Sequence, residues 1–355
     1  MKNQTMKKIL AAALSLTLVL AMSACTAKTE TTTTTTATAS TATESTAAEE
    51  TAGAKEATEE EVASTDLKIA IVKQLDHASM DEIADAVAAE LTAQGADYQI
   101  FSGQNDVSVL SQVGAQIIAD KYDAIIPIGT LAAQQMVVVA EDSETPVVYG
   151  AVSDPATAEL TDISYVTGTS DALNTAFMLD MMIAINPDVQ TVGLLYSTGE
   201  ANSITPIAAA KAYLDAAGIA YIEKTGNTND EIIAAVNSMV GQVEAVFTPT
   251  DNVVMAAELA TAEIMAEAGI AHYAGADSFV RNGAFATAGV NYADLGTKTA
   301  EMTMDILATG EVPEFHVMDG GIITVNTETA DTLGVDYAVF ADMAGTVVEV
   351  ITTEE

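Results

Sequence analysis

The sequence contains few basic residues for its length. Lys and Arg number 12 against 51 Asp and Glu, so the formal net charge is −39. Proteins bind nucleic acids through clusters of Lys and Arg that neutralise phosphates, and this composition therefore argues against a nucleic acid as partner. A strong excess of one charge keeps a protein soluble, and we interpret most of the acidic residues as a solubilising surface.

Residues typical of metal and cofactor chemistry are also scarce. The three histidines, His77, His272 and His316, show no H-x-x-x-H spacing, and the single cysteine can form no intramolecular disulfide or Cys-rich zinc site. The sequence lacks the glycine-rich phosphate-binding motifs and the G-x-S-x-G motif. We expect no metal, no cofactor and no catalytic residue. A carboxylate-only cation site and an exported α/β enzyme remain as alternatives.

Aromatic residues are few, and tryptophan is absent. Sugar sites often stack the sugar ring on an aromatic face, so a sugar or nucleoside ligand is disfavoured but stays open as an alternative. Tyr149, Tyr196 and Tyr273 are the candidate ring partners, although a place in the core is the simpler interpretation for Tyr149 and Tyr273.

The one cysteine, Cys25, follows a segment built like an export signal. Lys2, Lys7 and Lys8 precede an apolar run over residues 9–22, and two small residues come before the cysteine. A signal peptide has this order, and the run is shorter than the about 20 residues of a membrane-spanning helix. The sequence MSAC at 22–25 resembles a bacterial lipobox, which implies a signal peptide over 1–24 and lipidation of Cys25.

A segment rich in Thr, Ala and Glu follows the cysteine. Between residues 26 and 65 there is no aromatic residue, Leu or Ile. Such a chain cannot bury enough apolar surface to offset its ordering entropy, so residues 25–66 are predicted to form a lipidated, disordered tether. As a flexible coil its 40 residues would span roughly 35 Å.

From residue 67 onward, short apolar runs alternate with amphipathic segments. Continuous apolar runs such as 68–72 are typical of strands buried on both faces. At the start of the next segment, residues 79–82 (SMDE) match a capping box, and Thr205-Pro206 predicts another helix start. Strands are predicted at 68–72, 98–102, 123–128, 146–152, 165–170, 191–196, 219–224, 244–248, 270–273 and within 317–325, with helices between most of them.

This alternation predicts an α/β fold built from right-handed βαβ units and parallel sheets. The pattern divides into two similar halves. We expect one lobe from residues 67–168 plus about 290–318, a second from 169–289 plus about 319–340, and a C-terminal tail over 341–355. Two such sheets facing each other across a cleft would form a hinged clamp.

Polar segments follow most of the predicted strands. Ligands of open parallel sheets bind beyond the carboxyl ends of the strands, where helix N-termini favour anions. Thr130, Ser153 and nearby backbone N–H groups could hold a carboxylate, and Asp251, Asp277 or Glu200 an ammonium group. Together they would satisfy both ends of a small zwitterion.

Several of these segments resemble one family. Residues 196–203 (YSTGEANS) are similar to the Y-x-x-S-E-A-N-S segment of ABC transporter substrate-binding lipoproteins of the tryptophan and aromatic amino-acid-binding type. The segments 129–134, 151–155, 166–171, 249–252 and 277–284 resemble those of the same family in the same order. The resemblance covers about residues 67–336. Thr198-Gly199 departs from it, because the family usually has a serine before the glutamate.

The resemblance implies a type I periplasmic-binding-protein fold, a small-molecule ligand in the cleft, delivery to an ABC permease and its ATPase, and no catalysis. It places the protein outside the cytoplasm on a lipid anchor in the cell membrane. A receptor for a membrane signalling partner is the alternative. The cleft positions that it suggests are Asp76, Thr130, Ser153, Asp154, Ser170, Tyr196, Glu200, Asn202, Ser203, Thr250, Asp251, Asn252 and Asp277.

Overall fold

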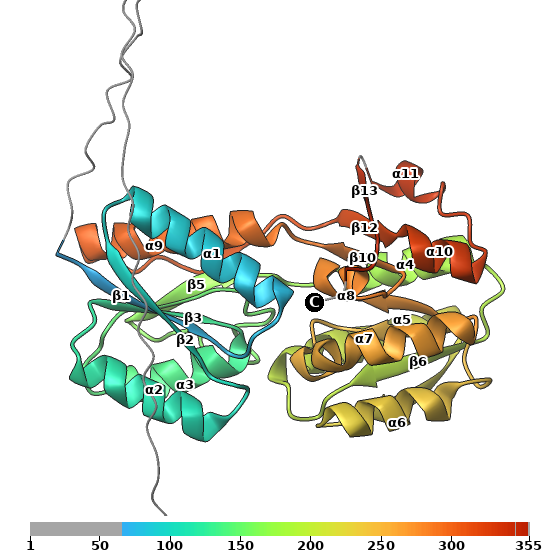
Figure 1. Cartoon of the computed structure of the whole chain (residues 1–355), viewed down its shortest axis with the longest axis horizontal. Coiled ribbons are helices and arrows are strands. Elements are labelled where there is room, and N and C mark those ends of the chain that lie inside the picture. The colour runs from blue at the N-terminus through green and yellow to red at the C-terminus, as the bar shows by residue number, and fades with distance from the viewer. Residues whose placement is uncertain (1–65, 345, 354–355) are drawn as a thin grey trace, which may run out of the picture. The chain divides into compact units, whose positions relative to one another are not determined.

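The computed structural model describes residues 66–344 and 346–353. The predicted signal peptide, Cys25 and nearly all of the predicted tether lie outside the described residues. The described part belongs to one compact unit and contains two sheets, each flanked by helices (Figure 1). The α/β fold predicted from the alternating pattern is therefore confirmed.

The first sheet has the strand order β11-β5-β4-β3-β1-β2, and its strand pairs run parallel. Its strands are β1 (Lys68–Lys73), β2 (Asp97–Ser102), β3 (Ala124–Ile128), β4 (Val147–Tyr149), β5 (Val166–Ser170) and β11 (His316–Val317). Its helices are α1 (Ala78–Ala93), α2 (Val107–Ala119), α3 (Thr130–Ala140) and α9 (Tyr292–Thr309). We call this part lobe 1.

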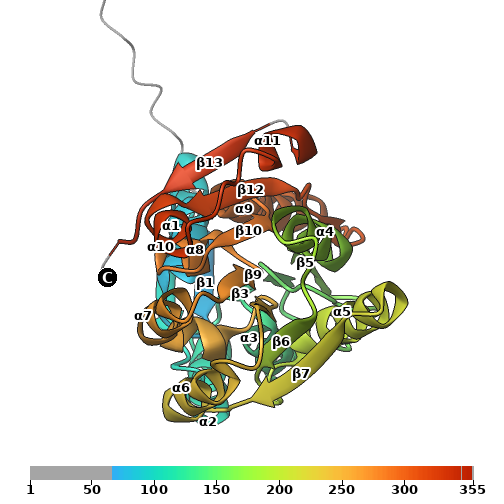
Figure 2. The same cartoon turned by 90° about the vertical axis from the view of Figure 1, so that its right-hand side faces the viewer.

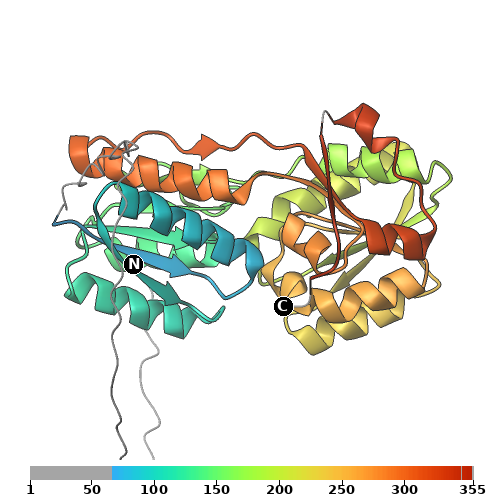
Figure 3. The ribbon, with the colours of Figure 1, turned by 45° about the horizontal axis from the view of Figure 1, so that its top comes forward.

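The alternation of side chains along β1 explains how lobe 1 packs. Ile69 and Ile71 are fully buried with residues of α1 and α9, whereas Ala70 and Val72 are buried with residues of α2 and α3. Successive side chains of a strand point to opposite faces, so a wholly apolar run requires helices on both. Figure 3 shows α1 and α9 side by side on one face of this sheet.

The second sheet has the order β13-β12-β10-β9-β8-β6-β7, and only β10 and β12 pair antiparallel in it. Its strands are β6 (Thr191–Tyr196), β7 (Ala220–Thr225), β8 (Ala245–Thr248), β9 (Ala271–Ala274), β10 (Ala286–Gly289), β12 (Ile322–Asn326) and β13 (Val347–Val350). The helices around it are α4 (Thr175–Ile185), η1 (Ala201–Ser203), α5 (Ile204–Ala217), α6 (Asn229–Met239), α7 (Asn252–Glu267), α8 (Asp277–Arg281), α10 (Thr327–Leu333) and α11 (Phe340–Met343). We call this part lobe 2 (Figure 2).

Two details differ from the expected elements. The last strand, expected within 317–325, is two strands: β11 pairs with β5 in lobe 1, and β12 pairs with β10 in lobe 2. Asp319, Gly320 and Gly321 lie between them and allow the chain to cross from one sheet to the other. The second difference is at residues 341–355, expected as a tail, where β13 pairs with β12 and extends the second sheet.

The chain crosses between the sheets at three places. The crossings are residues 171–174 after β5, residues 290–291 after β10 and residues 318–321 after β11. Helix α9 thereby returns to lobe 1 and packs closely on α1, since a Cβ added to Gly296 would lie 2.5 Å from the Ile83 carbonyl oxygen. This close approach fixes Tyr292, at the start of α9, beside the boundary between the lobes.

Candidate ligand-binding site

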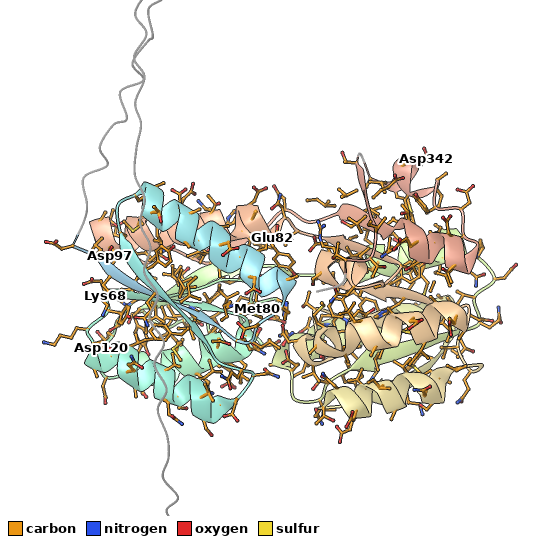
Figure 4. All side chains as sticks on the ribbon, viewed as in Figure 1. Lys68, Met80, Glu82, Asp97, Asp120 and Asp342 are labelled. Carbon is orange, nitrogen blue, oxygen red and sulfur yellow. The ribbon has the colours of Figure 1, made fainter. Side chains whose placement is uncertain are left out.

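A small cavity lies at the boundary between the two lobes. Lobe 1 lines it with Ser79, Met80, Ile83, Gly129, Thr130, Ala151 and Ser153, and lobe 2 with Asn202, Thr250, Asp251, Asn252, Met255, Ala276 and Phe279. Asp171 and Tyr292, next to two of the crossings, complete the wall. Figure 4 shows Met80 at the end of α1 that faces lobe 2.

Helix N-termini from both lobes meet at this cavity. Ser79, Thr130 and Asn252 all line it and lie in the first turns of α1, α3 and α7. The unpaired N–H groups of a helix start favour an anionic group. Three helix starts, two from lobe 1 and one from lobe 2, therefore contribute to the cavity wall.

Ser79 differs from the sequence prediction in a way that concerns the site. Helix α1 begins at Ala78 with His77 as N-cap, so the predicted capping box at 79–82 is wrong. The Ser79 hydroxyl is buried in the cavity wall and has no hydrogen-bond partner. Thr205 likewise does not cap α5, which begins at Ile204, and its hydroxyl donates to Asp154 instead.

Asp251, expected to hold an ammonium group, has another task. Its Oδ1 accepts hydrogen bonds from the N–H groups of Val253 and Val254, and its Oδ2 accepts from the Ser197 N–H and the Ser203 hydroxyl. With both oxygens occupied, this fully buried carboxylate is the N-cap of α7 and a tie to the loop after β6. It has little capacity left for a ligand.

A different carboxylate, Asp171, faces the cavity with fewer partners. Its Oδ1 accepts from the Ser153 hydroxyl at 2.8 Å and its Oδ2 from the Tyr292 hydroxyl at 3.2 Å. It is 6% exposed, and burial raises the pKa of its carboxyl. Asp171 closed one of the family-like segments, but neither it nor Tyr292 was among the predicted cleft residues. The sequence does contain a signal for Asp171. It directly follows a predicted strand, and it is not the N-cap of the next helix, α4, which is capped by Asn174.

Glu200 and Asn252 connect the lobes next to the cavity. Gln74 of lobe 1 donates to Glu200 Oε1 at 3.0 Å, and Asn252 donates to Glu200 Oε2 at 2.8 Å. The Asn252 side-chain oxygen lies 3.1 Å from Nε2 of His77, again across the boundary. Burial, followed by the nearby Asp251 carboxylate, raises the pKa of Glu200 to about 7.

The structure thus brings together Thr130, Ser153, Asn202, Thr250, Asp251 and Asn252 as lining residues, and Glu200, Ser170 and Ser203 in contact with that set. It does not place the remaining four at the cavity. Asp76 pairs with Lys73, Asp154 accepts from Thr157 and Thr205, Tyr196 donates to Glu223, and Asp277 pairs with Arg281. Each of these groups has a charged or hydroxyl partner outside the cavity.

In residues 66–344 and 346–353, no cluster of three or more His, Cys, Asp or Glu could hold a metal ion. No helix in the same part of the chain has the length and apolar character needed to cross a membrane.

Two lobes of mostly parallel sheet, with a polar cavity between them, define the type I periplasmic-binding-protein class. Residues 68–340 match the family model for ABC transporter substrate binding proteins, and the chain belongs to this family. Proteins of this family act outside the cytoplasm and bind small ligands without turning them over.

Among characterised relatives, a tyrosine-binding protein of Clostridioides difficile (strain R20291) is 27% identical over 281 residues, which cover 75% of this chain and 80% of that protein. A Streptococcus pneumonia ABC domain in complex with L-Trp is 26% identical, with a TM-score of 0.75 over 80% of this chain and all of that one. A ligand-free, open substrate-binding protein with adhesive properties from Clostridium difficile is 29% identical, with a TM-score of 0.62 over 81% of this chain and all of that one.

Proposed function

We propose that this protein is the lipid-anchored receptor of an ABC importer and binds a neutral amino acid, aromatic ones included, in the cavity between its lobes. This proposal depends on the groups that line the cavity. Helix N-termini, hydroxyl groups and the buried Asp171 carboxylate all line it. An amino acid carries opposite charges on neighbouring atoms, and this wall offers a complementary group to each.

The apolar part of the wall supports an uncharged side chain. Met80, Ile83, Met255 and Phe279 line the cavity, and no basic residue lines it. Methionine side chains adapt to irregular shapes, and aromatic rings pack favourably edge-to-face or offset. The two relatives with tyrosine and L-Trp in their names agree with a ligand of this kind.

Contacts between the lobes support ligand capture by closure. Gln74 with Glu200, His77 with Asn252, and Ser153 with Thr250 are hydrogen-bonded across the boundary. The higher TM-score to the L-Trp complex than to the open, ligand-free relative, at similar identity and coverage, agrees with a closed arrangement. A ligand that binds both lobes shifts the equilibrium toward the closed form only by its differential affinity for that form.

We propose the following organisation for the chain. Residues 1–24 are the signal peptide, Cys25 carries the lipid, and residues up to 66 are the tether to two lobes that deliver the ligand to a permease and its ATPase. Labelling cells with a palmitate analogue should mark the wild-type protein and not the Cys25→Ser variant. Label that persists in the variant would contradict the anchor.

The test of the ligand class is direct. Native mass spectrometry of the freshly purified protein identifies a copurifying small molecule, and calorimetry against the twenty amino acids ranks affinity. We expect binding of one or more neutral amino acids and no release of a chemically altered product. If none of the twenty bound while a sugar or nucleoside did, the proposed ligand class would be wrong.

A further inference from the structure

Two side chains of lobe 1 hold two side chains of lobe 2 at one place on the boundary. Gln74 donates to Glu200 Oε1 at 3.0 Å, and Nε2 of His77 lies 3.1 Å from the Asn252 side-chain oxygen. Glu200 and Asn252 are themselves joined, because the Asn252 amide donates to Glu200 Oε2 at 2.8 Å. These four residues form a continuous chain of hydrogen bonds in which two links cross the boundary. We call this chain the clasp.

The protons of the clasp can be assigned from its contacts. Because the Asn252 nitrogen donates to a carboxylate, the atom that faces His77 is the side-chain oxygen, which can only accept. Nε2 of His77 therefore carries a proton. Nδ1 of His77 is buried and has no hydrogen-bond partner, so a proton there would add a buried charge without an acceptor. Burial accordingly lowers the pKa of His77, and the neutral ring fits the clasp.

Glu200 is the buried carboxyl of the clasp. It is 6% exposed and accepts hydrogen bonds from the neutral amides of Gln74 and Asn252. In the described chain, no Lys, Arg or His forms an ion pair with it. A second buried carboxylate, Asp251, lies near it and disfavours a further negative charge. A buried carboxylate that lacks a cation is neutralised by taking up a proton.

Other charged groups face the clasp from both lobes. Asp251 of lobe 2 accepts four hydrogen bonds, three of them from backbone N–H groups, so Glu200, with fewer, is the carboxyl that takes the proton. The charged side chains on the lobe 1 side are Lys73, Asp76 and Asp81. Lys73 pairs with both aspartates, and all three belong to lobe 1, so separation of the lobes leaves these ion pairs intact.

We infer that the clasp is proton-sensitive: the lobes close with Glu200 protonated, and ionisation of Glu200 favours their separation. This inference rests on the proposed function and concerns the regulation of the ligand site. Separation takes Gln74 away from Glu200, and it takes α3 of lobe 1 away from η1, the short helix that directly follows Glu200. Water then reaches the carboxyl and stabilises its charged form, so opening releases the proton.

The direction of the pH effect follows from the two forms. The pKa of Glu200 is about 7 with the clasp formed, and the ordinary value for a glutamate is 4.5. Because the closed form has the higher pKa, closure takes up a proton, and Glu200 favours ligand binding below pH 7 and opposes it above. This contribution to affinity should fall about 10-fold between pH 6 and pH 8. His77 acts in the opposite sense, since closure keeps it neutral, but only at pH values near or below its ordinary pKa of about 6.5.

The experiment isolates Glu200 from every other titrating group. Calorimetry on the full chain against the twenty amino acids, L-tyrosine and L-tryptophan first, compares the wild type with Glu200→Gln at pH 6, 7 and 8. Gln has the shape of the protonated acid and cannot ionise, whereas His77, Asp251 and the groups of the amino acid are common to both titrations and cancel in the affinity ratio. For each amino acid that the wild type binds, its affinity relative to Glu200→Gln should fall about 10-fold from pH 6 to pH 8. Glu263→Gln, at an exposed position of α7, is the control, and its affinity ratio to the wild type should not change with pH.

A count of protons gives a second measurement. Titrations at pH 7 in buffers of different ionisation enthalpy report how many protons are taken up per amino acid bound. With a pKa of about 7 in the closed form, Glu200 is half protonated at this pH. The wild type should therefore take up about 0.5 proton more than Glu200→Gln. Equal proton counts in the two proteins would overturn the inference.

The outcomes separate this inference from the function on which it rests. If the wild type binds no amino acid at any of these pH values, the proposed function fails, and the inference with it. If an amino acid binds and the affinity ratio does not change with pH, the function stands and the inference alone is wrong. A pH-dependent difference between the two proteins in unfolding free energy, without one in affinity, would show that Glu200 stays buried when the lobes open, and would also overturn the inference.

Discussion

Gln74 and Glu200 meet across the boundary between the lobes, with Nε2 of Gln74 3.0 Å from Oε1 of Glu200. The Gln74 amide is held in lobe 1 by the Leu131 N–H and by Asn105, so it reaches Glu200 from a fixed position. Neither Gln74 nor Glu200 lines the cavity. The lobes are therefore joined by polar contacts beside the cavity, and Glu200 is buried at their boundary.

We expect Glu200 to make stability depend on pH. The pKa of Glu200 is about 7 in the folded protein, above its ordinary value of 4.5. A carboxyl with a raised pKa contributes stability that is fully present below pH 4.5 and lost as the pH rises through 7. This rise in pKa corresponds to about 3 kcal/mol. Urea unfolding between pH 4.5 and 8 should show that loss in the wild type.

The Glu200→Gln variant provides the comparison for this pH effect. Gln has the shape of the protonated acid, so the difference in unfolding free energy between wild type and variant should be small near pH 4.5 and should favour the variant above pH 7. Groups that surround Glu200, His77 and Asp251 among them, remain in both proteins and cancel in the difference. A difference that does not change with pH would show that Glu200 titrates normally.

The hydrogen bonds of Asp251 predict a structural role for its carboxylate. Its replacement by Ala leaves two helix N–H groups, the Ser197 N–H and the Ser203 hydroxyl without their acceptor. We expect a loss of at least about 3 kcal/mol of unfolding free energy, measured by urea denaturation. Asp106→Ala, which removes the exposed cap of α2, should be clearly less harmful. Equal losses of unfolding free energy in the two variants would show that burial of the Asp251 hydrogen bonds adds no stability.

The sequence predicted the architecture because the relevant signals are local. Runs such as 68–72 are apolar without interruption, and parallel strands bring their carboxyl ends to one edge, which agrees with Thr130 and Asn252 both lining the cavity. The roles of individual carboxylates were harder to predict. Asp251 directly precedes a helix, which is the position of an N-cap, and that rule identifies its actual role.

Asp171 and Tyr292 could not be paired from the sequence, because 121 residues separate them along the chain. Their contact requires α9 to return to lobe 1 through a crossing whose position has no local signature. The side-chain oxygen of Asn202 is buried and has no hydrogen-bond partner. This too depends on packing at the boundary, because the Asn202 amide nitrogen donates to the Thr250 carbonyl oxygen and the side-chain oxygen faces the other way. Residue type and spacing identify candidates, and the partners of each candidate decide its function.

The contact of α1 with α9 at Gly296 should control the position of Tyr292. A Cβ at Gly296 would lie 2.5 Å from the Ile83 carbonyl oxygen and 2.8 Å from Ala86, so Gly296→Ala must push the helices apart. We expect a loss of about 1–3 kcal/mol of stability from overpacking and weaker ligand binding. Gly150→Ala is the matched control, since its Cβ would find ordinary contacts at 3.5–3.6 Å with residues of the same two helices. Wild-type stability and affinity in Gly296→Ala would contradict this account.

Phe279 should favour aromatic over aliphatic ligands. It lies in the cavity wall, and its ring packs edge-on with His272 at 6.2 Å, which fixes its orientation. An aromatic pair contributes about 0.5–1.5 kcal/mol beyond the area that it buries, so Phe279→Leu should weaken L-tyrosine or L-tryptophan binding about 2- to 10-fold and affect L-leucine little. Calorimetry with all three ligands measures the ratio of aromatic to aliphatic affinity.

Phe285→Leu is the control for general loosening of the core. Phe285 is buried in the same lobe against Tyr273 and Phe340 but does not line the cavity. Because both variants lose the same ring, a change in the aromatic-to-aliphatic ratio only in Phe279→Leu would locate the ligand's side chain beside that residue, and an equal change in both would refute that location.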